Sequence, residues 1–191
     1  MRALDENTTI ILADPPWPHA NGSKTNSGKS PKYPLMNLRE IACLGEAIGA
    51  LAGDDAVLYL WATGPHLPGA ISTVSEWGFT YRSFHVWKKR RLACGFWARS
   101  NAELLLIAER GRPCPPRPAA LAPTVMDGDP WSSMHSAKPD FAHAQIERQW
   151  PHARKIELFA RQSRSGWETL GSDLGMHITH HGVRDAEAIT I

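Results

Sequence analysis

Asp14, Pro15, Pro16 and Trp17 form the tetrapeptide of this chain best suited to chemistry, and they follow the apolar run 9–13. The two prolines hold φ near about −65° and donate no backbone hydrogen bond, so we expect their carbonyls to be free to accept one from a ligand. A planar base with an exocyclic amine could donate its two N–H bonds to the Asp14 carboxylate and the Pro15 carbonyl while its ring stacks on Trp17. The equally weighted alternative is a strand that ends in an Asp-Pro turn beside a core tryptophan.

Alternating strand and helix patterns must position this tetrapeptide. A capping-box pattern at Asn37 and Glu40 begins one predicted helix, and Pro68 and Pro139 begin two more. Apolar residues at helical spacing predict that these helices span 38–51, 68–77 and 139–150. Apolar runs predict strands at 9–13, 56–61, 79–87, 104–108 and 155–159. The alternation predicts an α/β fold with one mainly parallel sheet and helices on both faces.

Two segments have the composition of loops. Residues 22–31 are rich in glycine, serine and lysine and follow the first strand, which predicts a mobile lid beside the site. Residues 111–123 are rich in proline, which predicts an irregular connection.

The composition limits the class of protein. The 191 residues are 42% hydrophobic, and we expect one domain over residues 1–176 with a C-terminal tail at 177–191. The formal net charge of +2 creates no global field for nucleic acid, although local basic patches could contact phosphate.

The cysteines and the hydropathy predict a cytoplasmic protein without a membrane partner. Cys43, Cys94 and Cys114 are widely spaced, which argues against a disulfide framework or a structural zinc site. No apolar leader opens the chain, and no apolar run is long enough to span a bilayer. The histidines of the tail lack a paired carboxylate or cysteine, so we expect no metal site.

The chain has eight tryptophans, many for its length. Trp61, Trp77 and Trp150 end apolar segments and are predicted to pack in the core. A second group has polar, glycine or proline neighbours and supplies candidates for ligand contact: Trp17, Trp97 and Trp131.

Three charged residues are candidates for holding a cofactor. The chain has neither GxGxxG nor GxxxxGK[ST], so we expect a cofactor without phosphate groups. Lys138 begins a predicted helix and could hold a carboxylate, or it could be an ordinary solvated lysine. Glu157 could accept both hydroxyls of a ribose with Arg161 orienting it, or the two could form a surface ion pair. His135 could contact substrate or cap a turn.

Taken together, these motifs resemble those of the MT-A70 family of S-adenosylmethionine-dependent adenine-N6 methyltransferases. Residues 11–17 resemble the family's strand and DPPW element, and residues 135–140 resemble its HSxKPD segment. Residues 155–161, with Trp167 and Gly171 after them, resemble its KIELFAR signature. Further matches to family positions are Tyr33, which resembles a substrate-gating tyrosine, the pairs Leu60-Trp61 and Trp77-Gly78, and residues 87–89, which resemble a Trp-x-Lys region.

The resemblance implies a Rossmann-like methyltransferase fold with a permuted motif order, in which the catalytic motif precedes part of the cofactor-binding region. It implies that Lys138, Glu157 and Arg161 surround the carboxylate and ribose of S-adenosyl-L-methionine. Family members often hold the cofactor adenine with an Asn-Gln pair, where this chain has Ser172 and Asp173. Those two residues, or backbone groups, are then the candidate contacts for the adenine.

The expected reaction is methyl transfer to N6 of adenine in DNA. The catalytic residues would be Asp14, Pro15, Pro16 and Trp17, with Asp14 also touching the cofactor. Substrate contacts are expected from Trp17, Tyr33, Lys88 and His135. The basic residues at 88–91 and Arg99 could bind phosphate, and the alternatives for them are a solvated loop or a dimer contact.

Two alternatives to a DNA methyltransferase remain open. One is an adenine-N6 methyltransferase that acts on RNA, and the other is a catalytically silent, nucleic-acid-binding subunit of a methyltransferase complex. The intact Asp14 argues against the silent subunit. The resemblance also implies a homodimer, or a heterodimer with a related subunit.

Overall fold

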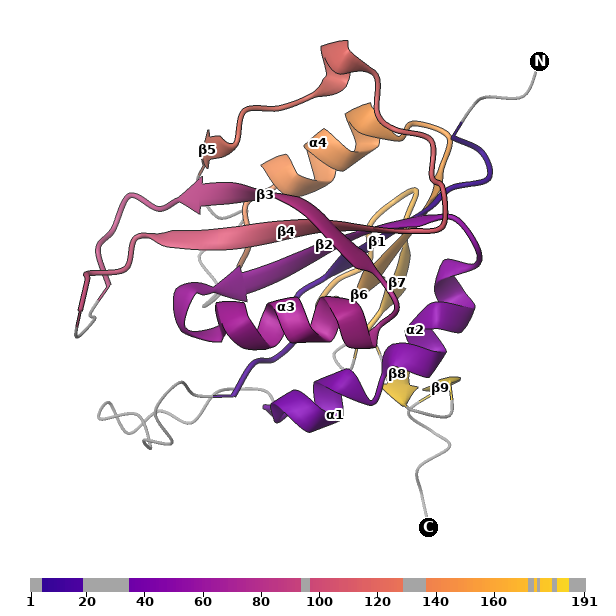
Figure 1. The fold of residues 1–191 in the computed structure, drawn as a ribbon, viewed down its shortest axis with the longest axis horizontal. Helices are drawn as coiled ribbons and strands as arrows, with labels where there is room; N and C mark the ends of the chain where they lie inside the picture. Colours follow the sequence, from indigo (N-terminus) through magenta and orange to yellow (C-terminus); the bar gives the residue numbers. More distant parts are fainter. Residues whose placement is uncertain are drawn as a thin grey trace.

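A seven-stranded sheet forms the centre of the protein. The computed structural model describes residues 5–18, 35–93, 97–128, 137–171 and 174, and the backbone of 176–179 and 182–185. The strands lie in the order β5-β3-β4-β2-β1-β6-β7 (Figure 1). Their bounds are β1 (Thr9–Ala13), β2 (Ala56–Thr63), β3 (Thr80–Lys88), β4 (Ala102–Arg110), β5 (Val125–Asp127), β6 (Arg154–Leu158) and β7 (Glu168–Leu170).

Most neighbouring strands of this sheet are parallel. β1 lies between β2 and β6 and is parallel to both, and the pairs β6-β7 and β3-β5 are also parallel. β4 is antiparallel to β2 and to β3, with which it forms a hairpin. The prediction of a mainly parallel sheet is therefore confirmed. The sequence did not predict that β4 is antiparallel.

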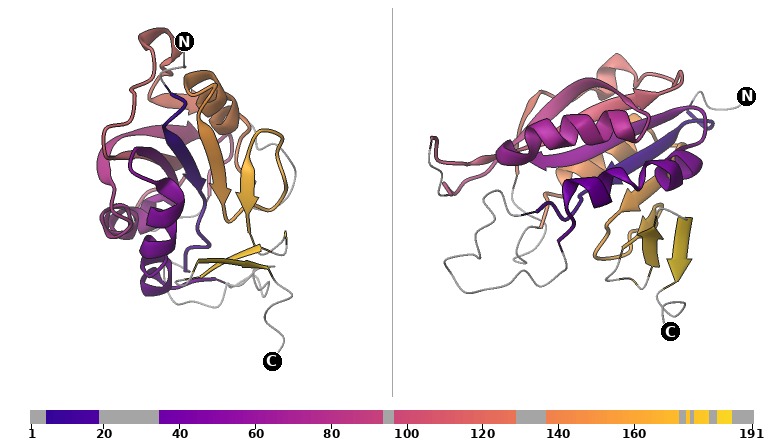
Figure 2. Two further views of the ribbon diagram at one scale, coloured as in Figure 1. Left: turned by 90° about the vertical axis from the view of Figure 1, so that its right-hand side faces the viewer. Right: turned by 60° about the horizontal axis from the view of Figure 1, so that its bottom comes forward.

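Helices cover both faces of the sheet, as predicted. α1 (Leu38–Ala42), α2 (Gly45–Ala52) and α3 (Leu67–Glu76) lie on one face, and α4 (Phe141–Gln149) lies on the other (Figures 1 and 2). Alternate residues of β1 point to opposite faces, so Ile11 packs with the first three helices and Ile10 packs with α4. Two separate apolar cores result, and β1 is buried between them.

The helix predicted over 38–51 is interrupted. Its capping box is confirmed, since the Asn37 side chain accepts a hydrogen bond from the Glu40 backbone and the Glu40 side chain accepts one from the Asn37 backbone. The chain then turns and restarts at Gly45, where a Cβ would lie 2.6 Å from the backbone oxygen of Glu76. The close approach of α2 to the end of α3 explains both the break and the glycine.

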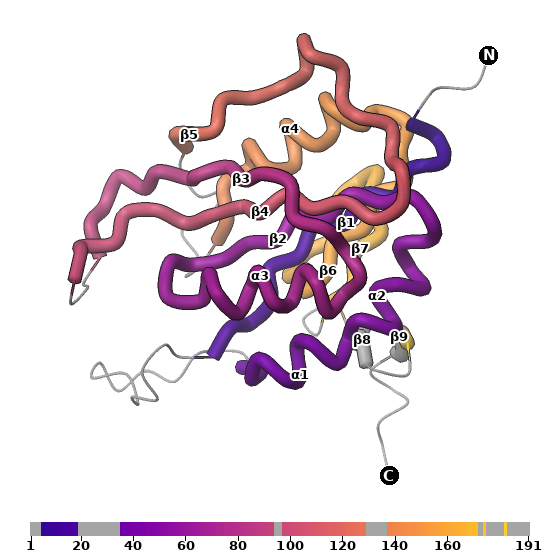
Figure 3. The backbone as a smooth tube through the Cα atoms, viewed as in Figure 1, coloured from indigo at the N-terminus to yellow at the C-terminus, as the bar shows by residue number. Residues whose placement is uncertain are grey.

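Two predictions, one about side chains and one about a loop, are confirmed. Trp61, Trp77 and Trp150 are buried. The proline-rich segment 111–123 is irregular apart from the short 3-10 helix η2 (Pro118–Ala120), and it passes over α4 (Figure 3). A hydrogen bond from the Gln145 side chain to the Ala120 carbonyl, 2.6 Å long, fastens η2 to α4.

Strands also form in the segment that we expected to be a tail. β8 (Met176–Thr179) and β9 (Gly182–Asp185) pair antiparallel in a second, two-stranded sheet. The predicted lid at 22–31 lies outside the described residues, as do Trp131, Cys94 and the tail histidines at 180 and 181. Among the residues that the structure describes, no helix has the length and apolar character needed to cross a membrane.

The Tyr59 hydroxyl links the sheet to the end of α4. It donates to Gln149 Oε1 at 2.8 Å and accepts from Trp150 Nε1 at 3.1 Å. Burial raises the pKa of Tyr59 to about 12, and the hydrogen bond from Trp150 opposes this rise.

We therefore predict that Tyr59→Phe lowers the free energy of unfolding by about 1–3 kcal/mol, because two buried polar groups lose their partner. The wild type should also lose stability between pH 10 and 12, where the tyrosine ionises in the unfolded chain before it does in the folded one. Denaturant titrations at pH 7 and at pH 11 measure both effects. Equal stability of the two proteins at pH 7 would contradict the prediction.

Candidate active site

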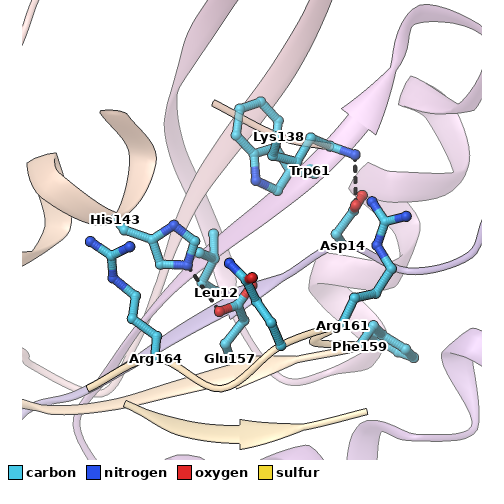
Figure 4. Close-up of a pocket in the computed structure, with 10 residues that line it drawn as sticks. Leu12, Asp14, Trp61, Lys138, His143, Glu157, Phe159, Arg161 and Arg164 are labelled. Carbon is cyan, nitrogen blue, oxygen red and sulfur yellow. Dashed lines mark hydrogen bonds and ion pairs between the residues drawn. The ribbon is translucent and has the colours of Figure 1, made fainter. Parts of the chain in front are cut away.

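The carboxyl ends of β1 and β6 meet at one edge of the sheet. Their parallel register places Ala13 beside Leu158, so the residues that follow each strand leave the sheet together. Asp14 follows β1, and Phe159 to Arg161 follow β6. A pocket opens there, and its wall includes side chains predicted to do chemistry: Asp14, Lys138, Glu157 and Arg161 (Figure 4). The structure thus brings together residues that are up to 147 positions apart in sequence, from Asp14 to Arg161.

The Lys138 ammonium lies between two carboxylates. Its Nζ donates to Asp14 Oδ2 at 2.6 Å and lies 3.5 Å from Glu103 Oε2. The other oxygen of Glu103 accepts a hydrogen bond from Lys89. The Lys138 and Glu103 side chains are only 15% and 11% exposed, whereas Asp14 and Lys89, at the two ends of this chain of four alternating charges, are 32% and 34% exposed. Of the two alternatives for Lys138, the arrangement excludes an ordinary solvated lysine.

The pKa values of this cluster follow from its burial and its charges. Burial raises the pKa of Asp14, and the positive charge of Lys138 acts in the opposite direction. Burial alone would lower the pKa of Lys138, but the attraction of Asp14 and Glu103 is stronger and holds the pKa above its ordinary value. Lys138 is therefore a permanent cation beside a carboxyl group whose ionisation depends on it.

A strained turn follows β6 and shapes the pocket wall. Phe159 has a φ of 62°, which is uncommon for a residue other than glycine. The Ala160 backbone then donates to the Leu170 carbonyl at 3.0 Å. A Cβ on Gly171 would lie 1.9 Å from the Ala160 backbone oxygen, so only glycine fits at that position. The turn directs Arg161 back toward Asp14 (Figure 4).

Glu157 lies in β6 between the buried residues Ile156 and Leu158, at the pocket side of the strand. Its Oε2 lies 2.9 Å from Nε2 of His143, a residue of α4. Figure 4 draws this contact and no ion pair between Glu157 and Arg161, which was the alternative for Glu157.

The proline carbonyls are not free, which corrects our expectation. The Pro15 carbonyl accepts a hydrogen bond from the Trp17 backbone at 2.8 Å, and the Pro16 carbonyl accepts one from the Met36 backbone at 3.0 Å. The first bond closes a tight turn, and the second holds the chain entering α1. Each carbonyl oxygen has a second lone pair, so a further bond to a ligand stays possible.

Trp17 is more buried than a ligand-stacking residue was expected to be. It is 9% exposed, its Nε1 donates to the Trp61 carbonyl at 2.9 Å, and its ring is stacked on His66 with centroids 5.9 Å apart. Trp97, by contrast, is fully exposed near the tip of the β3-β4 hairpin. The structure therefore separates the two candidates, with Trp17 buried in the core that α1, α2 and α3 cover and Trp97 on the surface.

Lys88 lies outside the pocket, at the end of β3. Its Nζ is 3.5 Å from Asp127, and both side chains are exposed. Because β3 runs in the same direction as β1, Lys88 still lies at the same sheet edge as Asp14. Four other predicted site residues lie outside the described part of the chain: Tyr33, His135, Ser172 and Asp173.

Four polar residues of the site were missed from the sequence: Glu103, His143, Gln162 and Arg164. Glu103 was overlooked because only the antiparallel direction of β4 brings the start of that strand to the same edge as the ends of β1 and β2. His143 was overlooked because a single histidine in a helix resembles any half-exposed surface residue. His143 follows Lys138 by five residues, so both lie near the start of α4. This proximity in sequence was the signal that could have identified His143.

The charge cluster generates a test by substitution. Glu103→Gln should lower the pKa of Asp14, because it removes a neighbouring negative charge, and Lys138→Gln should raise it, because it removes the positive one. A ¹³C NMR titration of the Asp14 carboxyl group measures both shifts. Glu109→Gln, which alters a half-buried carboxylate at the other end of β4, is the matched control and should change nothing. Shifts of the same sign in the two variants would contradict the arrangement.

Comparison with known proteins identifies the family. The MT-A70 family model matches residues 8–173. The Type II methyltransferase M.MunI of Mycoplasma sp is 30% identical over 183 residues, which cover 86% of this chain and 77% of that protein. The N(6)-adenosine-methyltransferase catalytic subunit METTL3 of Homo sapiens is 28% identical over 180 residues, covering 88% of this chain and 29% of that protein.

A plant relative shows a similar identity to the chain and is likewise covered over only part of its length. The N(6)-adenosine-methyltransferase MT-A70-like protein of Arabidopsis thaliana is 26% identical over 186 residues, covering 92% of this chain and 25% of that protein. The chain therefore spans most of the Mycoplasma protein but less than a third of these two eukaryotic relatives. The family match extends from the residue before β1 to beyond β7 and includes the whole pocket, so the chain belongs to the MT-A70 family.

Proposed function

We propose that this protein is a methyltransferase that uses S-adenosyl-L-methionine to methylate N6 of adenine in DNA. The observation that carries the proposal is the Asp14 carboxylate at the end of the central strand, 2.6 Å from Lys138, in a pocket that Glu157 also lines. The Asp14 carboxylate can accept a hydrogen bond from the amine of a substrate. Lys138 and Glu157 can bind the charged and hydroxyl groups of a methyl donor.

The donor set of the pocket fits S-adenosyl-L-methionine. Lys138 has three N–H donors, so it can bond a ligand carboxylate while it keeps its bond to Asp14, and Arg161 adds a second cation. Glu157 offers carboxylate oxygens for the two ribose hydroxyls. When bound, the cofactor would supply a methyl group on a positively charged sulfur; an amine nitrogen could attack the methyl carbon, and the thioether would leave with the electron pair of the C–S bond.

Asp14 would do the work on the substrate side. Its carboxylate accepts an N–H bond from the adenine amine and so turns the nitrogen lone pair out of conjugation with the ring. The second lone pair of a proline carbonyl, Pro15 or Pro16, accepts the other N–H. Positioning supplies most of the rate enhancement, and the excess proton leaves the nitrogen afterwards, either to Asp14 or to solvent water with Asp14 as an electrostatic anchor.

Trp17 keeps a supporting role in this proposal. Its ring is held by the Trp61 carbonyl and by stacking on His66, so it would fix the position of the Asp14-Pro15-Pro16 turn beside it. Tyr33 and His135 stay predicted substrate contacts, and Ser172 and Asp173 stay predicted contacts of the cofactor adenine.

The shared length favours DNA over RNA as the substrate. The chain covers 77% of a Type II methyltransferase but 25–29% of the two N(6)-adenosine-methyltransferases. The relation to these longer proteins makes RNA the second candidate. A homodimer or a heterodimer with a related subunit, a cytoplasmic location, and one catalytic domain at 1–176 are part of the same proposal.

The β3-β4 hairpin is a candidate nucleic-acid-binding element. It projects from the sheet edge that carries Asp14 (Figure 1). Basic residues follow β3, and the fully exposed Trp97 could stack on an unpaired base. A duplex substrate would have its target base flipped out, at a cost of roughly a few kcal/mol.

The activity is tested with labelled S-adenosyl-L-methionine and matched DNA and RNA oligonucleotides. We expect N6-methyladenine in DNA, and we expect Asp14→Asn to lower the transfer rate by about 10²–10⁴-fold, because the amide cannot accept the bond as a carboxylate does. Asp54→Asn, an exposed change at the opposite edge of the sheet, is the control. Product in RNA alone would establish the second candidate, and full activity of Asp14→Asn would refute the proposed role of Asp14.

The hairpin is tested by the salt dependence of binding. Replacing Arg91 and Arg99 together by glutamine should weaken duplex DNA binding equally for all sequences and reduce the slope of log K against log salt by about 0.9 for each lost phosphate contact. Replacing Arg112 and Arg117 together by glutamine, a charge-matched change beyond the other end of β4, should leave the slope unchanged. Fluorescence anisotropy at several salt concentrations gives these slopes, and an unchanged slope in the double variant would exclude the hairpin as the phosphate contact.

A further inference from the structure

We propose that His143 is a positioning residue that orients the Glu157 carboxylate toward the ribose hydroxyls of the cofactor, an inference that rests on the proposed function. His143 Nε2 lies 2.9 Å from Glu157 Oε2, and both side chains line the pocket (Figure 4). Among the described residues, His143 is the hydrogen-bond partner that the structure gives to this carboxylate.

Glu157 needs such a partner for the task proposed for it. A glutamate side chain has three rotatable bonds, and accepting two neighbouring hydroxyls requires one orientation of its carboxylate plane. The Glu157 side chain is 21% exposed, so its position in β6 does not by itself fix the orientation of the carboxylate group. A hydrogen bond to one oxygen selects an orientation before the ligand arrives and leaves the other lone pairs for the hydroxyls.

The imidazole is itself packed against Trp167, which is in turn held by a hydrogen bond. Its ring meets Trp167 edge to face, with centroids 5.0 Å apart and planes at 73°. Trp167 Nε1 donates to Glu147 Oε1 at 2.9 Å, and Arg164 Nε donates to the same oxygen at 2.8 Å. The hydrogen bond from Arg164 lowers the pKa of Glu147, so the carboxylate that anchors Trp167 stays ionised.

The second ring nitrogen indicates which tautomer is present. Nδ1 of His143 is buried and has no hydrogen-bond partner among the residues that the structure describes. A proton on Nδ1 would be an unpaired buried donor, which is costly, so the proton belongs on Nε2. His143 then donates to Glu157, which is the direction that a carboxylate requires.

Binding of S-adenosylhomocysteine, measured by isothermal titration calorimetry, tests the inference. We expect His143→Phe, which keeps a ring against Trp167 but removes the donor, to weaken binding about tenfold. His143→Gln, which restores an N–H donor, should recover most of the affinity. In the double variant with Glu157→Gln, the histidine change should add little, because both act through one contact.

The 2′,3′-dideoxy analogue of S-adenosylhomocysteine separates positioning from a structural role. This analogue lacks the hydroxyls, so His143→Phe should leave its affinity for the protein unchanged. In turnover, His143→Phe should raise the KM for S-adenosyl-L-methionine and leave kcat constant. His152→Phe, an exposed histidine change, is the matched control.

The outcomes distinguish this inference from the proposed function. If Glu157→Gln weakens binding but His143→Phe does not, or if His143→Phe weakens the dideoxy analogue equally, the inference is wrong and the proposed function stands. If the wild type binds neither S-adenosylhomocysteine nor S-adenosyl-L-methionine, the proposed function fails, and the inference fails with it.

Discussion

The site depends on one buried cation, the Lys138 ammonium between Asp14 and Glu103. A carboxylate shielded from water is costly unless an opposite charge accompanies it, and here two carboxylates share one lysine. Lys89 completes the balance by bonding Glu103. The four charges sum to zero, so Asp14 can stay ionised at a position where burial favours its neutral form. Any chemistry that needs the Asp14 carboxylate therefore depends on residues from four separate segments.

The sheet explains how these segments meet. β1 lies between β2 and β6 in parallel register, which brings Asp14 and the turn at Phe159 to one edge. The antiparallel β4 pairs Glu103 with Thr63 at the end of β2, so Glu103 arrives at the same edge from the opposite chain direction. Lys138 lies just before α4, on the face of the sheet that α4 covers. The strand order thus assembles a charge cluster that no local segment contains.

Much of the fold could be predicted from local patterns, because hydrophobic periodicity and caps depend on neighbours in sequence. The helices on both faces and the cofactor-site candidates Lys138 and Glu157 belong to this group. What failed depends on distant partners. The bonds that occupy the proline carbonyls, the burial of Trp17 and the break at Gly45 each follow from a contact with another segment. Such contacts exist only after the chain has folded, so composition and spacing could not reveal them.

A crystal structure of the protein with S-adenosylhomocysteine tests the central claim most directly, because the claim concerns where a ligand lies. We predict that the ligand carboxylate lies within hydrogen-bond distance of Lys138, that both ribose hydroxyls contact Glu157, and that the sulfur faces Asp14. A ligand bound elsewhere, or one that occupies the pocket without touching Lys138 and Glu157, would contradict the account.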